Sequence, residues 1–163
     1  MPQLESLLDR LVESSLEFAV VGGFAAMVHG VTFLTQDIDI CMPFTKENLF
    51  RLRDALAELH PVHRMTPQRL AFEVTDENVA RFKNVYLDTD YGTLDCLGEI
   101  LGIGDYSAVL PLSEKMLIGG KTCLVLGIEG LVRAKQSTNR THDRMTILQL
   151  RAIQERRRRF TES

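Results

Sequence analysis

Two aspartates, Asp37 and Asp39, lie one residue apart in the stretch Gln36–Ile40. On a β-strand, residues i and i+2 point to the same face, so both carboxylates would share one face while Ile38 and Ile40 enter the core. Two close carboxylates repel each other unless a cation lies between them. Mg²⁺ accepts one or two protein carboxylates and leaves its other positions to water and substrate phosphates. The pair therefore predicts a magnesium site; the alternative is the solvated face of an edge strand.

A third acid, Asp95, lies in a second predicted strand, where alternation places it opposite Leu94 and Cys96. It can meet the first two acids only if the two strands are neighbours in one sheet. Two acids on one strand and a third on another suit two-metal phosphoryl or nucleotidyl transfer. A similar pair, Asp88 and Asp90, runs into a turn, where Asp is favoured for local hydrogen bonds, and is interpreted as structural.

Two glycines, Gly22 and Gly23, follow the short apolar strand expected over 18–21. A glycine turn lets the backbone approach a ligand closely, and the N–H groups that start the next helix can bind phosphate. That helix is expected over 24–29, with Gly30 as its C-cap. His29, just before the cap, is explained as well by a hydrogen bond to nearby carbonyls as by a supporting role at the site.

The closing segment contributes the remaining candidates. Lys135 lies on the apolar stripe of its own helix, so its ammonium must either reach out to solvent or point into a polar cleft, where it would bind phosphate. Asp143 is expected to hold Lys135 or Arg140 in place. The run Arg156–Arg159 is interpreted as a solvated helix end, with RNA contact as the minority interpretation.

The elements that must position these residues alternate between helix and strand, which predicts an α/β (α+β) fold. The segment 62–81 is expected to hold one irregular strand, around 70–74. The other predicted elements are helices over 4–17, 45–59 (with Thr45 as N-cap), 128–137 and 141–158, and two hairpins that pair 83–88 with 93–97 and 115–118 with 121–126 around Gly119-Gly120.

With 163 residues and 45% hydrophobic content, the chain can build one sizeable core, so residues 1–163 are expected to form a single domain. No apolar run approaches the roughly 18 residues of a membrane span and no signal peptide is evident, so we expect a soluble cytoplasmic protein without a membrane partner. The three scattered cysteines are expected to be reduced core residues. From Arg133 onward nine basic residues stand against three acidic ones, whereas the preceding part has ten against nineteen.

The order and spacing of these motifs resemble the DNA polymerase beta-like nucleotidyltransferase superfamily. Within it, the stretch Val20–Ile40 most resembles the small AbiEii-like proteins, some of which are toxins of toxin–antitoxin pairs. The resemblance implies a nucleotidyltransferase fold, with a mixed β-sheet flanked by helices and with closing helices over about 128–158. It further implies roles for the site residues: Asp37, Asp39 and Asp95 as catalytic metal ligands, and Gly22, Gly23, Lys135 and Arg140 as nucleotide-binding residues.

The function implied by this resemblance is transfer of a nucleoside monophosphate (NMP) from an NTP to a hydroxyl group on tRNA or protein. Mg²⁺ or Mn²⁺ would be the cofactor, and an antitoxin protein would be a partner if the chain is a toxin component. The alternative is a catalytically inactive relative that binds a nucleotide or a partner protein through the same cleft. The three acids favour the enzyme, whereas Phe24, which stands where many active members have serine, favours the inactive relative.

Overall fold

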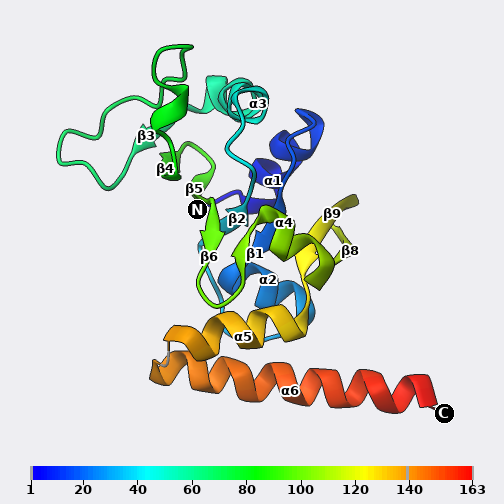
Figure 1. The fold of residues 1–163 in the computed structure, drawn as a ribbon. Coiled ribbons are helices and arrows are strands. Elements are labelled where there is room, and N and C mark those ends of the chain that lie inside the picture. The colour runs from blue at the N-terminus through cyan, green and yellow to red at the C-terminus, as the bar shows by residue number, and fades with distance from the viewer. Residues whose placement is uncertain (1, 139, 163) are drawn as a thin grey trace.

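The computed structural model describes residues 2–138 and 140–162, and these form a mixed β-sheet with helices on both faces (Figure 1). The predicted mixed sheet flanked by helices is therefore confirmed. In spatial order the strands of the main sheet are β3 (Val62–His63), β4 (Asn84–Thr89), β5 (Gly92–Leu97), β2 (Asp37–Cys41), β1 (Ala19–Val21), β9 (Lys121–Leu126) and β8 (Ser113–Ile118). A separate two-stranded sheet pairs β6 (Glu99–Ile100) with β7 (Gly104–Asp105).

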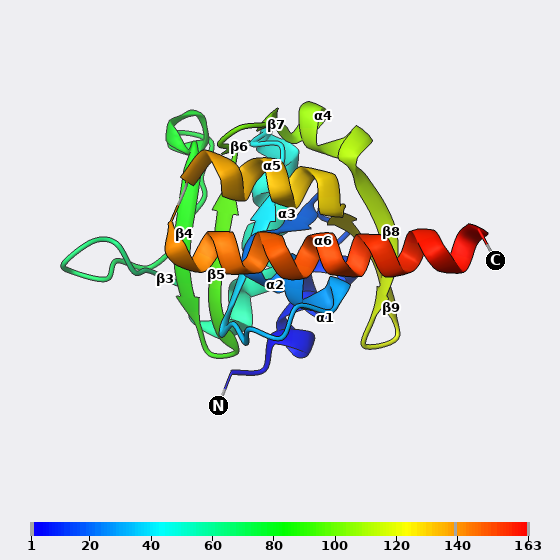
Figure 2. The ribbon, with the colours of Figure 1, turned by 90° about the horizontal axis from the view of Figure 1, so that it is seen from below.

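The helices divide between the two faces of the main sheet. They are α1 (Leu4–Glu13), α2 (Gly22–His29), α3 (Lys46–Leu56), α4 (Tyr106–Val109), α5 (Ile128–Thr138) and α6 (Thr141–Glu162), with short 3-10 turns at Ala57–Leu59, Val79–Arg81 and Leu110–Leu112. α1 packs against α3 and β9, whereas α2 packs against α5, α6 and the strands β1 and β2. Figure 2 shows α5 and α6 lying side by side across the sheet.

The strands alternate as the sequence predicts. Ile38 and Ile40 are fully buried, and the buried apolar side chains of strands and helices form one hydrophobic cluster. Both predicted hairpins are present, and Gly119 and Gly120 have φ angles of +57° and +86°, which suit a tight turn. The three cysteines are buried and unpaired, as predicted.

Several predicted helices are wrong in extent. α2 begins at Gly22 rather than after the glycine pair, and α6 continues to Glu162 rather than ending near Arg158. The first helix ends at Glu13 rather than near Glu17, because Ser15 has a φ of +62° and the backbone of Glu17 is hydrogen-bonded through both its N–H and its C=O to the buried side chain of Asn48. The helix after Thr45 begins as predicted, with the threonine side chain accepting from the Asn48 N–H, but it changes to a 3-10 turn after Leu56.

The strand expected around 70–74 is reduced to a single bridge between Ala71 and Val62. The side chains of Phe72 and Val74 are buried, whereas that of Leu70 is exposed. The segment therefore packs against the core through single side chains and not as a hydrogen-bonded β-strand. Among the described residues, no helix combines the length and the apolar character needed to cross a membrane.

Candidate active site

The three acids predicted from the sequence lie on one face of the sheet. β2 and β5 are parallel neighbours, and their register places Asp39 directly opposite Asp95 and Asp37 opposite Thr93. Residues that face each other in this register point to the same side. β2 and β5 are therefore neighbours, as the prediction for Asp95 requires, and Asp39 lies against Gly22 of α2.

Asp39 is electrostatically strained at this position. Burial, which is the largest cause, and the neighbouring charges of Asp95 and Asp37 together raise the pKa of Asp39 from 3.8 to about 6, against the opposing effects of Lys135 and Arg64. A cation at this face would relieve the repulsion, and hard carboxylate oxygens suit Mg²⁺ or Mn²⁺. Asp37 and Asp39 thus fit one divalent ion.

Gly22 is required by the position of the Asp39 carboxylate. Its φ is +66°, and a Cβ atom added there would lie 2.3 Å from Oδ2 of Asp39. Gly23 differs, since its added Cβ would lie at an ordinary contact distance of 3.7 Å from Thr35. The first residue of α2 is therefore a glycine because an acid from β2 packs against its backbone.

The closing helices contribute a charged cluster around Asp143. This carboxylate is 1% exposed and contacts Nζ of Lys135 at 3.4 Å and Nε of Arg140 at 3.0 Å, and it accepts a hydrogen bond from Thr138. Burial alone would raise the pKa of Asp143, but the two hydrogen bonds and the charge of Lys135 outweigh it and lower the pKa to about 2. The sequence predicts that Asp143 holds Lys135 or Arg140, and in the structure it contacts both.

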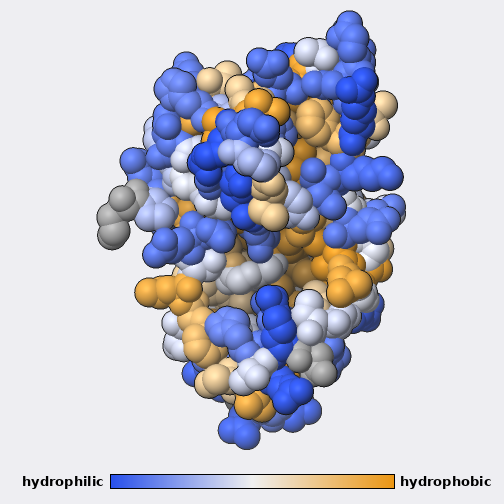
Figure 3. Space-filling model, turned by 90° about the vertical axis from the view of Figure 1, so that its left-hand side faces the viewer, coloured by the Kyte–Doolittle hydropathy of each residue, from blue (hydrophilic) through white to orange (hydrophobic). Residues whose placement is uncertain are grey.

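A pocket of about 340 Å³ joins these groups. Gly22 and Asp39 lie on one side of it, and Lys135, Arg140 and Asp143 lie on the other. Seen from the side on which β6 lies, the molecule is hollowed across its middle and apolar residues line the hollow (Figure 3). The arrangement places a helix N-terminus, the Asp39 carboxylate and two cations around a single space, which suits a nucleoside triphosphate with its metal.

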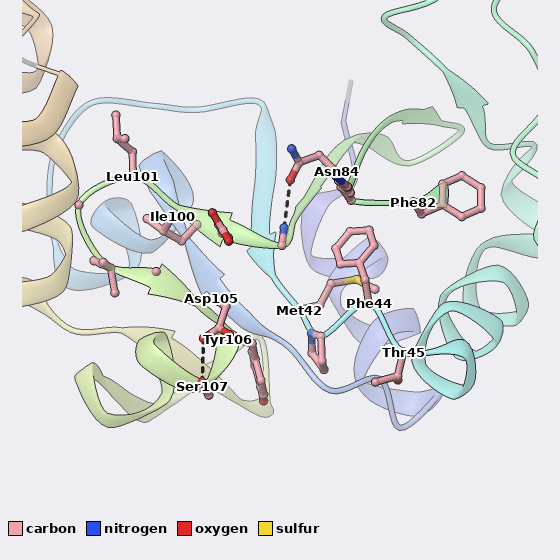
Figure 4. A pocket seen from close by; sticks show the side chains of 17 residues that line it. Met42, Phe44, Thr45, Phe82, Asn84, Ile100, Leu101, Asp105, Tyr106 and Ser107 are labelled. Carbon is pink, nitrogen blue, oxygen red and sulfur yellow. Dashed lines mark hydrogen bonds between the residues drawn. The ribbon is translucent and has the colours of Figure 1, made fainter. Parts of the chain in front are cut away.

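A larger pocket, of about 1250 Å³, adjoins the first (Figure 4). Both are lined by Glu99, Ile100 and Leu101. In Figure 4, Met42, Phe44 and Thr45 face Ile100, Asp105 and Tyr106 across the larger pocket.

Three solved structures share this architecture. A candidate nucleotidyltransferase from Thermotoga maritima, TM1012, superposes with a TM-score of 0.56 at 18% sequence identity, covering 90% of this chain and 88% of its own. The solution structure of the antibiotic-resistance factor ANT(2'')-Ia gives a TM-score of 0.55 at 15% identity, with 98% of this chain and 93% of that chain covered. This chain has the nucleotidyltransferase fold.

The crystal structure of ANT(2'')-Ia in complex with adenylyl-2''-tobramycin gives a TM-score of 0.50 at 15% identity, covering 91% of this chain and 95% of that one. The sequence matches no protein-family model and no curated protein. The AbiEii-like grouping therefore stays a prediction from the motifs, while the nucleotidyltransferase fold is shared with all three structures.

Arg64 is a residue of the site that the sequence did not predict. Its guanidinium donates to both oxygens of Asp95, from Nε to Oδ1 at 3.1 Å and from the terminal nitrogen to Oδ2 at 2.5 Å. Arg64 belongs to the segment 62–81, where no periodic pattern indicates which side chains face the sheet. Within the described residues, no three Asp, Glu, His or Cys side chains are grouped so that together they could hold a metal ion, so Asp37, Asp39 and Asp95 do not form one three-ligand site in this structure.

Two other candidates are buried outside the pocket. His29 donates from Nε2 to the carbonyl of Leu126 at 2.9 Å, and its Nδ1 lies 3.1 Å from Arg157, while burial lowers its pKa. It therefore joins α2 to β9 and α6. Phe24 is 4% exposed within the core, so it supplies no hydroxyl but also does not obstruct the pocket.

Asp88 and Asp90, the acid pair that the sequence analysis interprets as structural, contact neighbouring side chains. Asp88 accepts from Arg69 at 2.7 Å and from Thr93 at 2.9 Å, and Asp90 contacts His60 at 2.6 Å. These contacts tie the β4–β5 hairpin to its surroundings, as predicted.

Asp143→Asn is expected to destabilise the protein at pH 7 by about 2 kcal/mol, because the folded state favours the charged carboxylate. The sign follows from a folded pKa below the unfolded one: the contribution is present above pH 4 and is lost as the pH falls toward 2. Urea unfolding at pH 7 and at pH 3 measures the difference. Asp54→Asn, at an exposed acid paired with Arg53, is the control and should change stability by less than about 0.5 kcal/mol. A loss that is equal at both pH values would contradict the assignment.

Proposed function

We propose that this protein transfers an NMP from an NTP to a hydroxyl acceptor, with Mg²⁺ or Mn²⁺ held by Asp37 and Asp39. The supporting observation is the placement of Asp39 opposite Asp95 and against Gly22, in a pocket that Lys135 lines from α5. The three structures with this fold include a nucleotidyltransferase bound to an adenylylated compound, which supports the same reaction class here.

Backbone N–H groups and two cationic side chains of the pocket would bind the phosphate groups of the NTP. The N–H groups at the start of α2 have no side-chain cap, so they are available to phosphate oxygens. Lys135 neutralises the triphosphate, and Arg140, which is largely exposed at the pocket rim, adds a second cation. The bound ion would supply Lewis-acid chemistry, by neutralising phosphate charge and lowering the pKa of a hydroxyl beside it.

The larger pocket supports a small acceptor rather than tRNA or protein. Among the described residues that line it, Lys83 is the one base, whereas Glu99 and Asp105 are acids. A tRNA would need many phosphate-binding cations at this opening. A neutral or cationic compound with hydroxyl groups fits the volume, the aromatic rings of Phe44 and Tyr106 and the acidic balance.

The test is transfer of label from α-labelled NTPs in the presence of Mg²⁺. Each NTP is incubated with three acceptor pools: small hydroxyl compounds that include aminoglycosides, total RNA, and lysate protein. Label is expected in the small-molecule pool together with release of pyrophosphate. Label in RNA or protein would support NMP transfer but would contradict a small-molecule acceptor, in favour of the tRNA or protein that the sequence resemblance implies. The absence of label in all three pools would favour the inactive relative.

Two observations favour the inactive relative: Phe24 supplies no hydroxyl, and Arg64 engages both oxygens of Asp95. Such a protein would still bind Mg²⁺ and an NTP in the smaller pocket but would release no pyrophosphate. The toxin role, and with it an antitoxin partner, stays a prediction from the sequence resemblance.

Lys135→Ala is expected to weaken NTP binding by roughly 10- to 100-fold, since a hydrogen bond to a charged group contributes about 1.5–3 kcal/mol. Mn²⁺ binding without nucleotide should change little. The control is Lys121→Ala, because Lys121 also pairs with a carboxylate, Glu13 at 3.3 Å, but lies in the β8–β9 hairpin. Calorimetric titration with a non-hydrolysable ATP analogue measures both. Equal affinities of the two variants for the ATP analogue would mean that Lys135 has only a structural role.

A further inference from the structure

The contact between Arg64 and Asp95 engages both carboxylate oxygens of the third acid. Nε and a terminal nitrogen of the guanidinium each donate to a different carboxylate oxygen. This two-point geometry is the strongest form of an arginine–carboxylate pair. The side chains are shielded, with 29% of Arg64 and 13% of Asp95 exposed, so solvent competes weakly for them.

The position of Arg64 is set independently of the pair. Its backbone N–H donates to the carbonyl of Tyr86 at 3.0 Å, which fixes the residue beside β4. Its guanidinium also lies 5.5 Å from the centre of the Tyr86 ring, in a cation–π contact. Tyr86 in turn pairs with Asp95 across the β4–β5 hairpin, so the ring and the acid lie on paired residues of the sheet and the arginine is hydrogen-bonded beside them.

A guanidinium bound in this way competes with a metal ion for Asp95. A divalent ion would have to share these two oxygens and would meet a fixed positive charge in contact with both of them. The charge of Arg64 also acts on Asp39, whose pKa it lowers against the effect of the neighbouring acids. Arg64 therefore supplies positive charge to both carboxylates from one fixed position.

We propose that Arg64 takes the place of a second metal ion, so that the nucleotide-bound site holds one divalent ion, on Asp37 and Asp39, and a guanidinium on Asp95. The inference rests on the proposed function, which supplies the first ion. Arg64 is a positioning residue in this arrangement: it keeps Asp95 from binding metal and balances the charge of the acidic face.

The test counts bound Mn²⁺ by electron paramagnetic resonance at saturating non-hydrolysable ATP analogue. The wild-type chain is expected to bind one ion, and Arg64→Gln is expected to bind two, because the freed Asp95 carboxylate then completes a second site. Arg69→Gln is the matched control, since Arg69 lies in the same segment and pairs with Asp88 at 2.7 Å; it should keep one ion.

Two ions in the wild-type protein would overturn the proposal, because Arg64 would then have left Asp95, and would leave the proposed function intact. One ion in Arg64→Gln, with a wild-type circular dichroism spectrum, would also overturn it. No ion in any of the three proteins would instead remove the metal-dependent function on which the inference rests. The wild-type count alone decides the question if Arg64→Gln does not fold.

Discussion

Replacing Asp37 and Asp39 together with asparagine is expected to abolish both NMP transfer and the stabilisation by Mg²⁺ with NTP. Transfer should fall by more than roughly 10²-fold, since even groups that only orient metal ligands contribute about 10- to 100-fold. In the wild-type protein, ligand at 100 times its Kd should raise the free energy of unfolding by about 2.7 kcal/mol. Thermal melting with and without Mn²⁺ and ATP analogue measures the loss of this stabilisation.

The same variant should be more stable than the wild type without metal at pH 7. The folded pKa of Asp39, about 6, lies above its ordinary value of 3.8, so the wild-type free energy of unfolding falls as the pH rises between these values. Above pH 6 the gain from asparagine is at most about 3 kcal/mol, and below pH 4 it should disappear. An apo variant that is less stable than the wild type at pH 7 would mean that the acids are structural partners and not an ion site.

Gly22→Ala is expected to lower both the stability of the protein and its affinity for NTP and Mn²⁺. The new Cβ would lie 2.3 Å from Oδ2 of Asp39, and the φ of +66° is unfavourable for any residue with a side chain. We expect a loss of about 1–3 kcal/mol in the free energy of unfolding. We also expect NTP and Mn²⁺ to bind at least about tenfold more weakly, because Asp39 must move.

Gly23→Ala is the matched control, one residue along the same helix. Its Cβ has room beside Thr35, and alanine favours helix, so stability should stay the same or rise by up to about 1 kcal/mol. Urea unfolding and calorimetric titration of both variants separate the two positions. Equal effects at Gly22 and Gly23 would show that the close approach of Asp39 to Gly22 has no consequence.

The parts of the site that follow from local patterns could be predicted. Alternation along β2 placed Asp37 and Asp39 on one face, and helical spacing placed Lys135 and Asp143 within reach of each other. Both arguments use only the periodicity of a single element or of two consecutive helices. The opposition of Asp39 and Asp95 needed one further assumption, that the two strands are neighbours, and the parallel register of β2 and β5 satisfies it.

Arg64 could not be predicted in this way. It reaches Asp95 from 31 positions earlier in the chain, out of a segment whose path is determined by isolated buried anchors such as Phe72 rather than by a ladder. A short-range pattern carries no information about such a contact. The early end of α1 has a similar cause, because Asn48, far along the sequence, captures the backbone of Glu17.

The most direct test of the account is a crystal structure with Mn²⁺ and a non-hydrolysable ATP analogue, with the ion located by its anomalous scattering. We expect the anomalous peak between the carboxylates of Asp37 and Asp39, and the triphosphate between the N-terminus of α2 and Lys135. A nucleotide bound elsewhere, or an anomalous peak away from both aspartates, would contradict the assignment of this pocket as the nucleotidyl-transfer site.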